Sequence, residues 1–249
     1  MVPSDDWKPT TKFEYFGGAQ RSPEWFKLRL GKATASRLVD WLAVSKAEKT
    51  KGAPLKPRLD YEKELMFERQ FGVSFDNYVT PAMQDGVDFE DFARRQYEKI
   101  MKTIVYECGA WYNDAFVASP DGVIYLEGST DQGDRNKVDG LLEIKVLKDT
   151  KFTEVLATGV LDPHWKQIQG QLWASGAKWC DYVVINLNTK KIKIIRVERD
   201  EEFIEWIELT LTEQLVSGAL DTENVYDFID AIPADLEAAV ERDLTGGWA

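Results

Sequence analysis

The stretch LLEIKV, residues 141–146, places an acid and a base two positions apart inside an otherwise apolar run. Short runs of Leu, Ile and Val are typical of buried strands. Side chains alternate between the two faces of a strand, so Glu143 and Lys145 are expected to point the same way. Such a pair is either a structural ion pair or part of a reactive site.

A second carboxylate lies in the sequence SPDG, residues 119–122, at the end of an earlier strand-like segment. An Asp before a Gly is by itself most often only a turn residue. If the two segments are neighbours in one sheet, Asp121 and Glu143 meet at its edge. Two close carboxylates repel each other, and a divalent cation between them relieves that repulsion.

Oxygen ligands of this kind suit Mg²⁺, with Mn²⁺ as a substitute. The backbone carbonyl of Ile144 is available as a further ligand, and Lys145 could hold a water and offset developing negative charge. A hard metal, a water and a lysine are what hydrolysis of a phosphodiester needs. The alternative is a plain salt bridge on a half-exposed strand, which is the commoner origin of an isolated Glu-x-Lys.

Composition limits the other kinds of site. The chain has 249 residues, a formal net charge of −12, two cysteines and one histidine. These numbers exclude a four-cysteine zinc site, an iron–sulfur cluster and a histidine cage. The net negative charge argues against a protein that coats nucleic acid without sequence preference. A local basic channel would still steer DNA to an enzyme. The widely spaced thiols, the lack of a signal-peptide pattern and the lack of a long apolar run predict a cytoplasmic protein outside the membrane.

Hydrophobic periodicity predicts helices first, then strands, then a helix, a hairpin and further helices. The expected helices cover 21–31, 34–44, 58–72, 80–101, 162–176, 199–218 and 234–244, and the expected strands cover 102–112, 115–126, 141–147, 180–187 and 191–197. This order indicates an α/β (α+β) fold with a central mixed β-sheet flanked by helices.

Several helix ends carry recognisable signals. The expected N-caps and first-turn prolines are Ser22 with Pro23, Thr34 or Ser36, Thr80 with Pro81, and Asp162 with Pro163, and the closing glycines are Gly31 and Gly176. The buried stripe of helix 80–101 is expected at Phe89, Phe92, Ala93, Tyr97 and Ile100, with Glu90 at its border. The loop 45–58 carries Lys46, Lys49, Lys51, Lys56 and Arg58 against Glu48. This loop is either a solvated segment or a contact for a polyanion.

Asp121 with Glu143, Ile144 and Lys145 resembles the PD-(D/E)XK nuclease pattern, including Pro120 before the Asp. More widely, the chain is similar to the lambda exonuclease and YqaJ-like viral recombinase family. The segments that carry the resemblance stand in the family's order between about residues 20 and 200. They are EWFKLRLGKATAS (24–36), GVDFEDFARRQYE (86–98), ASPDG (118–122), LEIK (142–145), HWKQIQGQLW (164–173) and CDYVVIN (180–186).

The resemblance implies a role for each matching residue. Asp121, Glu143 and the Ile144 carbonyl would bind the catalytic metal, Glu90 would serve a second metal or its waters, and Lys145 would position the attacking water. The residues that match the family's 5′-phosphate pocket are Arg29, Ser36, Ser119 and Gln167. Residue chemistry agrees for Ser36, at a helix start, and for Arg29, whose planar fork suits phosphate. Without the family, Ser36 would be read as a cap and Arg29 as a surface residue.

Helix 162–176 carries further polar residues whose roles are less specific. Gln167 and Gln171 share one helix face and Gln169 lies away from it, which on its own would indicate a polar exposed face. His164 is expected on the surface or beside DNA rather than on a metal. Trp25 belongs to the family signature and is expected to pack.

By resemblance, residues 1–249 form a single nuclease domain with a restriction-endonuclease-like core at about 20–220 and an extension at 221–249. The implied enzyme is a Mg²⁺-dependent 5′-to-3′ exonuclease. It would degrade one strand of double-stranded DNA from an end and leave a 3′ single strand for a phage-type annealing protein. The family implies a ring-shaped homotrimer, phage or prophage encoded and working in the bacterial cytoplasm.

Two other functions fit the same core: a structure-specific endonuclease, and a non-catalytic scaffold that binds DNA ends. The retained Asp121, Glu143 and Lys145 argue against the scaffold. The segment between Asp121 and Glu143 is longer than the family pattern, and its polar part, 127–140, indicates an extended hairpin tip. We expect this insertion to leave the site intact. The basic loop falls where the family has a loop that grips DNA.

Overall fold

The computed structural model describes residues 12–75, 81–126 and 137–216, with the backbone alone at 81–88 and 212–216. The strands are β1 (Glu14–Phe16), β2 (Ala33–Thr34), β3 (Ala110–Tyr112), β4 (Phe116–Ala118), β5 (Gly122–Ile124), β6 (Gly140–Leu147), β7 (Trp179–Asn186) and β8 (Ile192–Glu198). The helices are α1 (Pro23–Arg29), α2 (Leu38–Trp41), α3 (Lys56–Phe71), α4 (Pro81–Met101), α5 (Asp149–Thr158), α6 (Asp162–Ser175) and α7 (Glu201–Val216), with 3₁₀ helices η1 (Ala35–Arg37) and η2 (Glu48–Thr50). The predicted cap Thr80, the helix 234–244 and the extension 221–249 lie outside the described residues.

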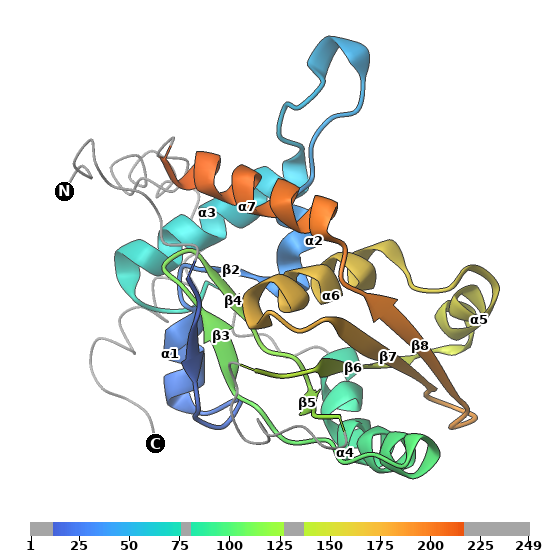
Figure 1. Ribbon diagram of the computed structural model, residues 1–249. Coiled ribbons are helices and arrows are strands. Elements are labelled where there is room, and N and C mark those ends of the chain that lie inside the picture. Colours follow the sequence, from blue (N-terminus) through green and yellow to red (C-terminus); the bar gives the residue numbers. More distant parts are fainter. Residues whose placement is uncertain (1–11, 76–80, 127–136, 217–249) are drawn as a thin grey trace.

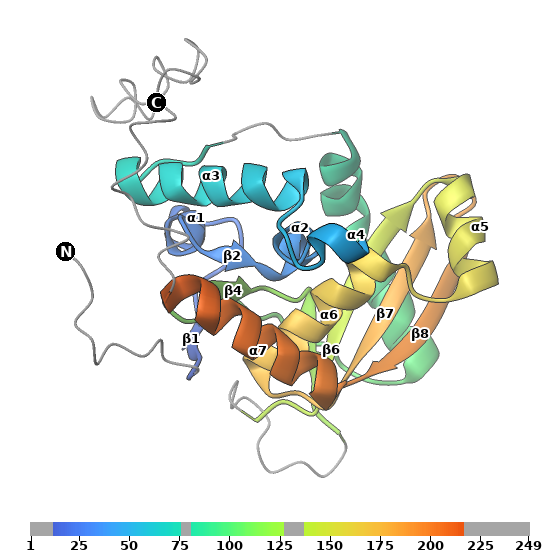
Figure 2. The same cartoon turned by 90° about the horizontal axis from the view of Figure 1, so that it is seen from above.

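The strands form two four-stranded sheets, in the orders β1-β3-β4-β2 and β5-β6-β7-β8. Each sheet is mixed: β6 and β7 run parallel, whereas β5–β6 and β7–β8 are antiparallel. Helices cover the second sheet on both faces, with α6 and α7 on one side and α4 on the other (Figures 1 and 2). This arrangement confirms the predicted fold class, with two sheets where one central sheet was expected.

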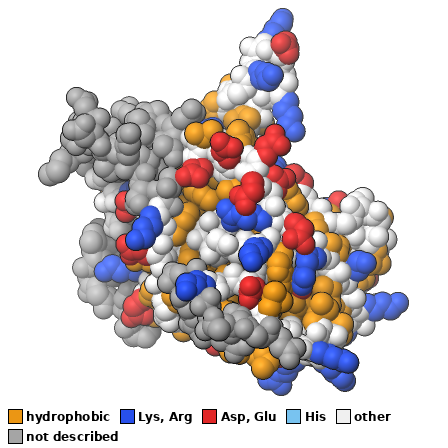
Figure 3. Space-filling model, in the orientation of Figure 1, with side chains coloured by type: hydrophobic (Ala, Val, Ile, Leu, Met, Phe, Trp, Pro, Cys, Tyr) orange, Lys and Arg blue, Asp and Glu red, His pale blue; other side chains and the backbone are white. Residues whose placement is uncertain are grey.

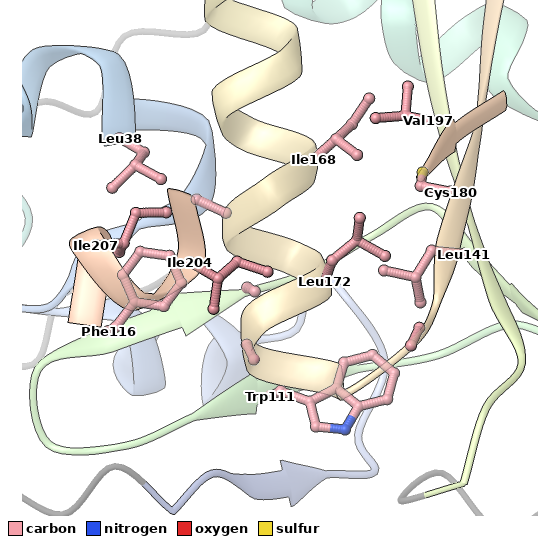
Figure 4. Close-up of a cluster of buried hydrophobic side chains, with 14 of the residues drawn as sticks. Leu38, Trp111, Phe116, Leu141, Ile168, Leu172, Cys180, Val197, Ile204 and Ile207 are labelled. Carbon is pink, nitrogen blue, oxygen red and sulfur yellow. The ribbon is translucent and has the colours of Figure 1, made fainter. Parts of the chain in front are cut away.

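Helix α6 lies at the centre of the larger core. Figure 4 shows Ile168 and Leu172 between the strand residues Leu141 and Cys180 on one side and Leu38 with its neighbours on the other. All of these side chains are fully buried, which favours this packing through the hydrophobic effect. Close approach is possible because α6 carries a glycine where it crosses the 3₁₀ turn.

At Gly170 of α6, an added Cβ would lie 3.1 Å from Leu38 Cδ2 and 3.1 Å from Phe116 Cζ. Any larger residue would push α6 away from α2, from β4 and from η1, whose Ala35 Cβ would lie 3.6 Å from the added atom. Since η1 carries Ser36 and α6 carries Gln167, this glycine fixes the distance between two elements that hold predicted site residues.

The smaller core lies between α4 and the opposite face of the sheet. Ala93 and Tyr97 are buried there against Leu142, Ile144 and their neighbours. The predicted stripe of α4 is wrong at two positions, because Phe92 is 40% exposed and Ile100 is 55% exposed. Residue 92 is rotated by about 100° from residue 93 on a helix. Ile100 lies in the last turn, after the helix has made its buried contacts.

Two predicted helix starts also differ. The segment after Thr34 forms one 3₁₀ turn and a single α-helical turn, and no side chain caps it. The hydroxyl of Thr34 contacts that of Ser36 at 3.1 Å instead. In α6 the N-cap is Leu161, and Asp162 is the first helical residue. The Asp162 carboxylate accepts a hydrogen bond from Lys166 at 2.8 Å rather than from the backbone.

The basic loop projects from the molecule as a long excursion between α2 and α3 (Figure 1). Figure 3 shows Lys and Arg side chains on this projection. Lys46, Lys49 and Lys51 are exposed there. Lys56 and Arg58, expected in the loop, belong to the first turn of α3 and pair with acids one turn later. No helix in the described ranges is long and apolar enough to cross a membrane.

Candidate active site

Strand β6 brings the acid and the base of the site together. Glu143 and Lys145 lie on one face of this strand, and Lys145 Nζ is 2.5 Å from Glu143 Oε1. Glu143 is only 2% exposed, so its charge is largely removed from water. The predicted shared face is therefore confirmed.

Asp121 lies at the point where β5 begins. Its backbone N–H donates to Leu142 O at 3.0 Å, and its Oδ2 accepts from the backbone N–H of Ile144 at 2.6 Å. The Asp121 carboxylate thus gives β6 one more hydrogen bond beyond the end of its neighbouring strand, β5. In a strand the N–H and C=O of one residue point toward the same neighbour, so the Ile144 carbonyl faces the side of Asp121.

Burial and neighbouring charges shift the pKa values of Asp121 and Lys145. Burial raises the pKa of Asp121 well above its usual range, and the negative charges of Glu143 and Glu90 raise it further, against the opposing effect of Lys145. Burial alone would lower the pKa of Lys145, but Glu143 and Asp121 outweigh it and raise that pKa. Lys145 therefore stays protonated, and one ammonium faces two desolvated carboxyl groups.

This donor set fits a hard divalent cation. Asp121 and Glu143 supply carboxylate oxygens and Ile144 a carbonyl oxygen, which are the ligand types that Mg²⁺ and Mn²⁺ prefer. A cation would also stabilise the ionised form of Asp121, whose charge is costly where it lies. In the described part of the chain, no three side chains of His, Cys, Asp or Glu converge closely enough to hold a metal by themselves. The backbone carbonyl is therefore needed for a third protein ligand.

Helix α6 holds Glu143 from the opposite side. Gln167 Nε2 donates to Glu143 Oε1 and Gln171 Nε2 donates to Glu143 Oε2, both at 2.6 Å. Gln169 points away and bonds the backbone near Glu198. The prediction that Gln167 and Gln171 share a face is confirmed, but the face is buried rather than exposed. Sequence reasoning missed the role of Gln171, for which the spacing of four from Gln167 was the available signal.

Glu90 of α4 is held by two arginines. Its carboxylate is 2.6 Å from Arg21 Nη2 and 2.8 Å from Arg94 Nη2. Arg94 also donates to the backbone carbonyl of Asp121 at 3.1 Å. Glu90 is therefore near enough to Asp121 to affect its pKa, while its own oxygens are occupied. Its role beside a metal stays a prediction.

Arg29 is the half-buried cation among the predicted phosphate ligands. Its guanidinium lies over the Trp25 ring, 4.2 Å from the centroid. Burial lowers its pKa, partly offset by Tyr61 and Glu68. Within the described residues, no side-chain or backbone oxygen accepts a hydrogen bond from it. A desolvated guanidinium in this state strongly favours an anion.

Trp25 connects Arg29 to the strand end beside Asp121. Its indole N–H donates to Ser119 Oγ at 3.0 Å. Ser36 is exposed, and its hydroxyl contacts that of Thr34. The backbone N–H of Thr34 donates to the hydroxyl of Tyr61 at 2.9 Å, and Tyr61 is close enough to Arg29 to affect its pKa. Arg29, Ser36 and Ser119 are thus linked through shared neighbours. Gln167, predicted to join them, is instead bonded to Glu143.

Helix α3 fixes the turn that follows Arg29. Glu68 Oε2 accepts from the backbone N–H of Gly31 at 2.9 Å, and Arg69 Nε donates to the Gly31 carbonyl at 2.6 Å. These contacts join residues more than 35 positions apart, so no local pattern identifies them. They explain how a short, exposed helix holds Arg29 in a defined place.

His164, the single histidine, is half-buried in the first turn of α6. Its Nδ1 lies 2.5 Å from the hydroxyl of Tyr182, which is the register partner of Glu143 in β7. Burial, and then the charges of Lys145 and Lys151, lower the pKa of His164 to about 4. The imidazole is therefore neutral at pH 7 and packs beside the site rather than on the surface.

A cavity of about 610 Å³ opens next to Asp121. Its wall includes Glu90, Arg94 and Glu107 together with the segment 17–21 that precedes α1. Asp121 is thus reachable from outside along a polar path, as a substrate would require, whereas Glu143 does not line this cavity.

Comparison with known proteins agrees with this geometry. Residues 24–178 match the family model of the YqaJ-like viral recombinase domain. The chain is similar to the alkaline exonuclease LHK-Exo from Laribacter hongkongensis, with 32% identity, a TM-score of 0.65 and coverage of 84% of this chain and 98% of that one. The same enzyme in complex with dAMP gives 31% identity, a TM-score of 0.66 and the same coverage.

A phage-related exonuclease from Haemophilus somnus 129PT shares the fold at 13% identity, with a TM-score of 0.56 over 81% of this chain and 96% of that one. No curated protein matches the sequence.

Proposed function

This chain belongs to the YqaJ-like viral recombinase family, and we propose that it is a metal-dependent exonuclease that digests one strand of double-stranded DNA from an end. Its direction is 5′ to 3′, and its product is a 3′ single strand for recombination by annealing. The related enzyme from L. hongkongensis is an alkaline exonuclease, and one of its structures contains dAMP.

One observation carries the proposal: Asp121 and Glu143 share a desolvated site in which the pKa of Asp121 is raised, with Lys145 beside them. A structural ion pair would balance one acid with one base. Here a second carboxyl group is placed beside a pair that is already complete. Such an excess of buried acid is costly unless a cation or a reaction uses it.

Asp121, Glu143 and the Ile144 carbonyl would hold Mg²⁺ or Mn²⁺. When bound, the ion supplies a Lewis acid for the phosphate and makes a bound water more acidic. The protein groups do the rest of the positioning. Lys145 Nζ remains protonated beside two acids. There it can orient a water and stabilise the negative charge that develops on the phosphate oxygens in the transition state. Gln167 and Gln171 prevent the Glu143 carboxylate from rotating.

The proposed polarity depends on Arg29. Its guanidinium is desolvated and has no acceptor in the described part of the protein, and Ser119 links it through Trp25 to the strand end next to Asp121. A terminal 5′-phosphate would satisfy this charge while the next phosphodiester lies at the carboxylates. Ser36 would add a hydroxyl donor to the same phosphate.

The first experiment is digestion of linear duplex DNA, labelled on one strand, with 5′-phosphate or 5′-hydroxyl ends. It is run with and without Mg²⁺ beside a closed circular control. The expected result is Mg²⁺-dependent loss of the 5′-phosphorylated strand and an intact circle. Cutting of the circle would establish the endonuclease instead. Binding without cleavage in either Mg²⁺ or Mn²⁺ would establish a scaffold.

The Arg29→Ala variant tests the polarity. It should slow digestion of 5′-phosphorylated ends by about 10- to 100-fold, because one charge-assisted bidentate contact to the phosphate is lost. Digestion of 5′-hydroxyl ends should be affected far less. Arg95→Ala is the matched control, since Arg95 is exposed on α4 and pairs with Asp91. An equal loss for both ends would rule out the phosphate pocket.

The proposal includes a ring-shaped homotrimer and a phage-type annealing protein as partner, in the cytoplasm of a bacterial host. A ring separates an acidic exterior from a DNA channel, which would reconcile the net charge of −12 with DNA binding. Light scattering on the purified protein, where the mass of one chain is 28.5 kDa, tests the trimer.

A further inference from the structure

We propose that Arg21 is a DNA-binding residue of the active site, which holds a backbone phosphate of the strand being cut and exchanges Glu90 for that phosphate when DNA binds. It is separate from the four side chains proposed for the terminal 5′-phosphate. The inference rests on the proposed nuclease function and adds a substrate contact to it.

The backbone holds Arg21 in an unusual conformation. Its φ is +66°, a left-handed value that residues other than Gly, Asn and Asp seldom adopt. The preceding residue fixes this segment in place, because Gln20 Nε2 donates to the carbonyls of Pro120 at 2.8 Å and Cys108 at 3.1 Å. Pro120 is the residue before Asp121. A strained residue tied to the catalytic turn suggests a functional position.

Arg21 lines the cavity of about 610 Å³ that opens beside Asp121. A strand whose phosphodiester reaches Asp121 passes through this space. The other charged groups on the wall are Glu90, Glu107, Asp121 and Arg94. Acidic side chains outnumber basic ones here by three to two, so a phosphate entering the cavity needs every cation that can turn toward it.

The two arginines on Glu90 differ in what they can release. Arg94 is 16% exposed, and its two terminal nitrogens bond Glu90, Glu107 and the Asp121 carbonyl, so these nitrogens are committed to the protein. Its Nε has no hydrogen-bond partner in the described part of the chain, but it is buried and closed to a ligand. Arg21 is 50% exposed, and its ion pair with Glu90 uses one nitrogen, Nη2. Among the described residues it has no second acceptor. Its remaining N–H groups are therefore available to a ligand.

Exchange of partners at Arg21 is physically easy. A half-exposed ion pair is weak, because water screens it and solvates both groups when they separate. A phosphate accepts two parallel N–H bonds from a guanidinium, which is a better match than a single contact. Glu90 does not become unpaired, since Arg94 still holds its other oxygen.

The test is the salt dependence of DNA binding in an inactive Lys145→Ala parent. Arg21→Asn removes the charge while Asn tolerates the left-handed backbone. Loss of one phosphate contact should reduce the slope of log K against log salt concentration by about 0.9 on duplex DNA or about 0.7 on a single strand. Affinity should fall to the same extent for 5′-phosphate and 5′-hydroxyl ends. Arg21→Lys should restore the slope, since it restores the charge.

Arg95→Asn is the matched control, because Arg95 is 73% exposed in a single ion pair with Asp91 on the same helix as Glu90, away from the cavity wall. Its slope should equal that of the parent. An unchanged slope in Arg21→Asn, in a parent that binds DNA, would overturn this inference and leave the nuclease proposal standing. A parent that binds no DNA at any salt concentration would overturn the proposed function, and this inference with it.

Discussion

Glu143 and Asp181 are two buried carboxylates on neighbouring strands of one sheet, and they have opposite characters. Asp181 of β7 is the register partner of Leu142, one residue before Glu143, so the two acids lie on opposite faces. Asp181 is 1% exposed and accepts two bonds from Arg196, at 2.8 and 2.9 Å, and one from the Tyr97 hydroxyl at 2.6 Å.

The comparison separates burial from function. Asp181 accepts two hydrogen bonds from one guanidinium, and in the described part of the chain its hydrogen-bond network contains no second acid, so its charge is balanced by Arg196. Glu143 has at least as many donors, yet Asp121 adds a further carboxyl group to the same space. An acid in excess of its bases, rather than a buried acid as such, distinguishes the face of this sheet that we propose to be reactive.

The largest effect is expected from Glu143→Gln, which removes the charge and keeps the shape. Cleavage should fall by about 10²- to 10⁴-fold, since a proposed metal ligand and its effect on proton transfer are lost. Stability should change little, because a neighbour that repels Asp121 is removed. Single-turnover digestion and thermal unfolding measure the two quantities. Full activity would make Glu143 structural, like Asp181.

Asp181→Asn should have the converse result. It leaves Arg196 and Tyr97 without their charged partner, and breaking a buried pair costs about 3–5 kcal/mol, here reduced to about 2–3 because Arg196 is 43% exposed. Activity per folded molecule should be retained. Urea unfolding and digestion at low temperature check this. A large loss of cleavage in fully folded protein would erase the distinction between the faces.

Gln171→Met sharpens the comparison within the reactive face. Gln171 holds Glu143 Oε2 at 2.6 Å, and loss of a residue that orients a metal ligand typically weakens metal affinity by about 10- to 100-fold. Calorimetric titration with Mn²⁺, in the absence of DNA, measures it. Ser175→Ala is the control: this serine is buried one turn later and donates to the Gln171 carbonyl, without touching Glu143. Equal losses would indicate general loosening of α6.

Local periodicity accounts for much of the site. The alternation in LLEIKV placed Glu143 and Lys145 on one face, and the four-residue spacing placed Gln167 with Gln171. The start of α1 followed from Ser22 and Pro23. Contacts between residues distant in sequence were not predictable. Arg21 pairs with Glu90, 69 positions away, and Gln171 hydrogen-bonds Glu143, 28 positions away. From the sequence alone, the polar residues in these contacts would be assigned to the solvent-exposed surface, and only the fold shows that they pair.

The smallest predicted effect concerns His164, which packs on the reactive face. Its folded-state pKa is about 4, below the ordinary 6.5, so the unfolded chain binds the extra proton first. The free energy of unfolding should therefore fall as pH drops from 6.5 toward 4 and level off below that. We expect a loss on the order of 1 kcal/mol between pH 7 and pH 5.

His164→Asn should lack this part of the pH dependence, because Asn cannot titrate yet can still bond the Tyr182 hydroxyl. Chemical unfolding at pH 7 and pH 5 compares the two proteins. The same pH dependence in both would mean that other groups cause it.

The double attachment of Asp121 to β6 has a consequence for how this protein tolerates change. One residue, through its backbone N–H to Leu142 and its carboxylate to Ile144, fixes the position of both acids. Further along, Asp139 closes the base of the intervening segment by bonding Leu126 and Ile124. The length of the segment between residues 126 and 137 therefore does not affect the positions of Asp121 and Glu143. Descendants of this gene could lengthen, shorten or replace that connection, and even fuse another module there, while the same atoms stay in register.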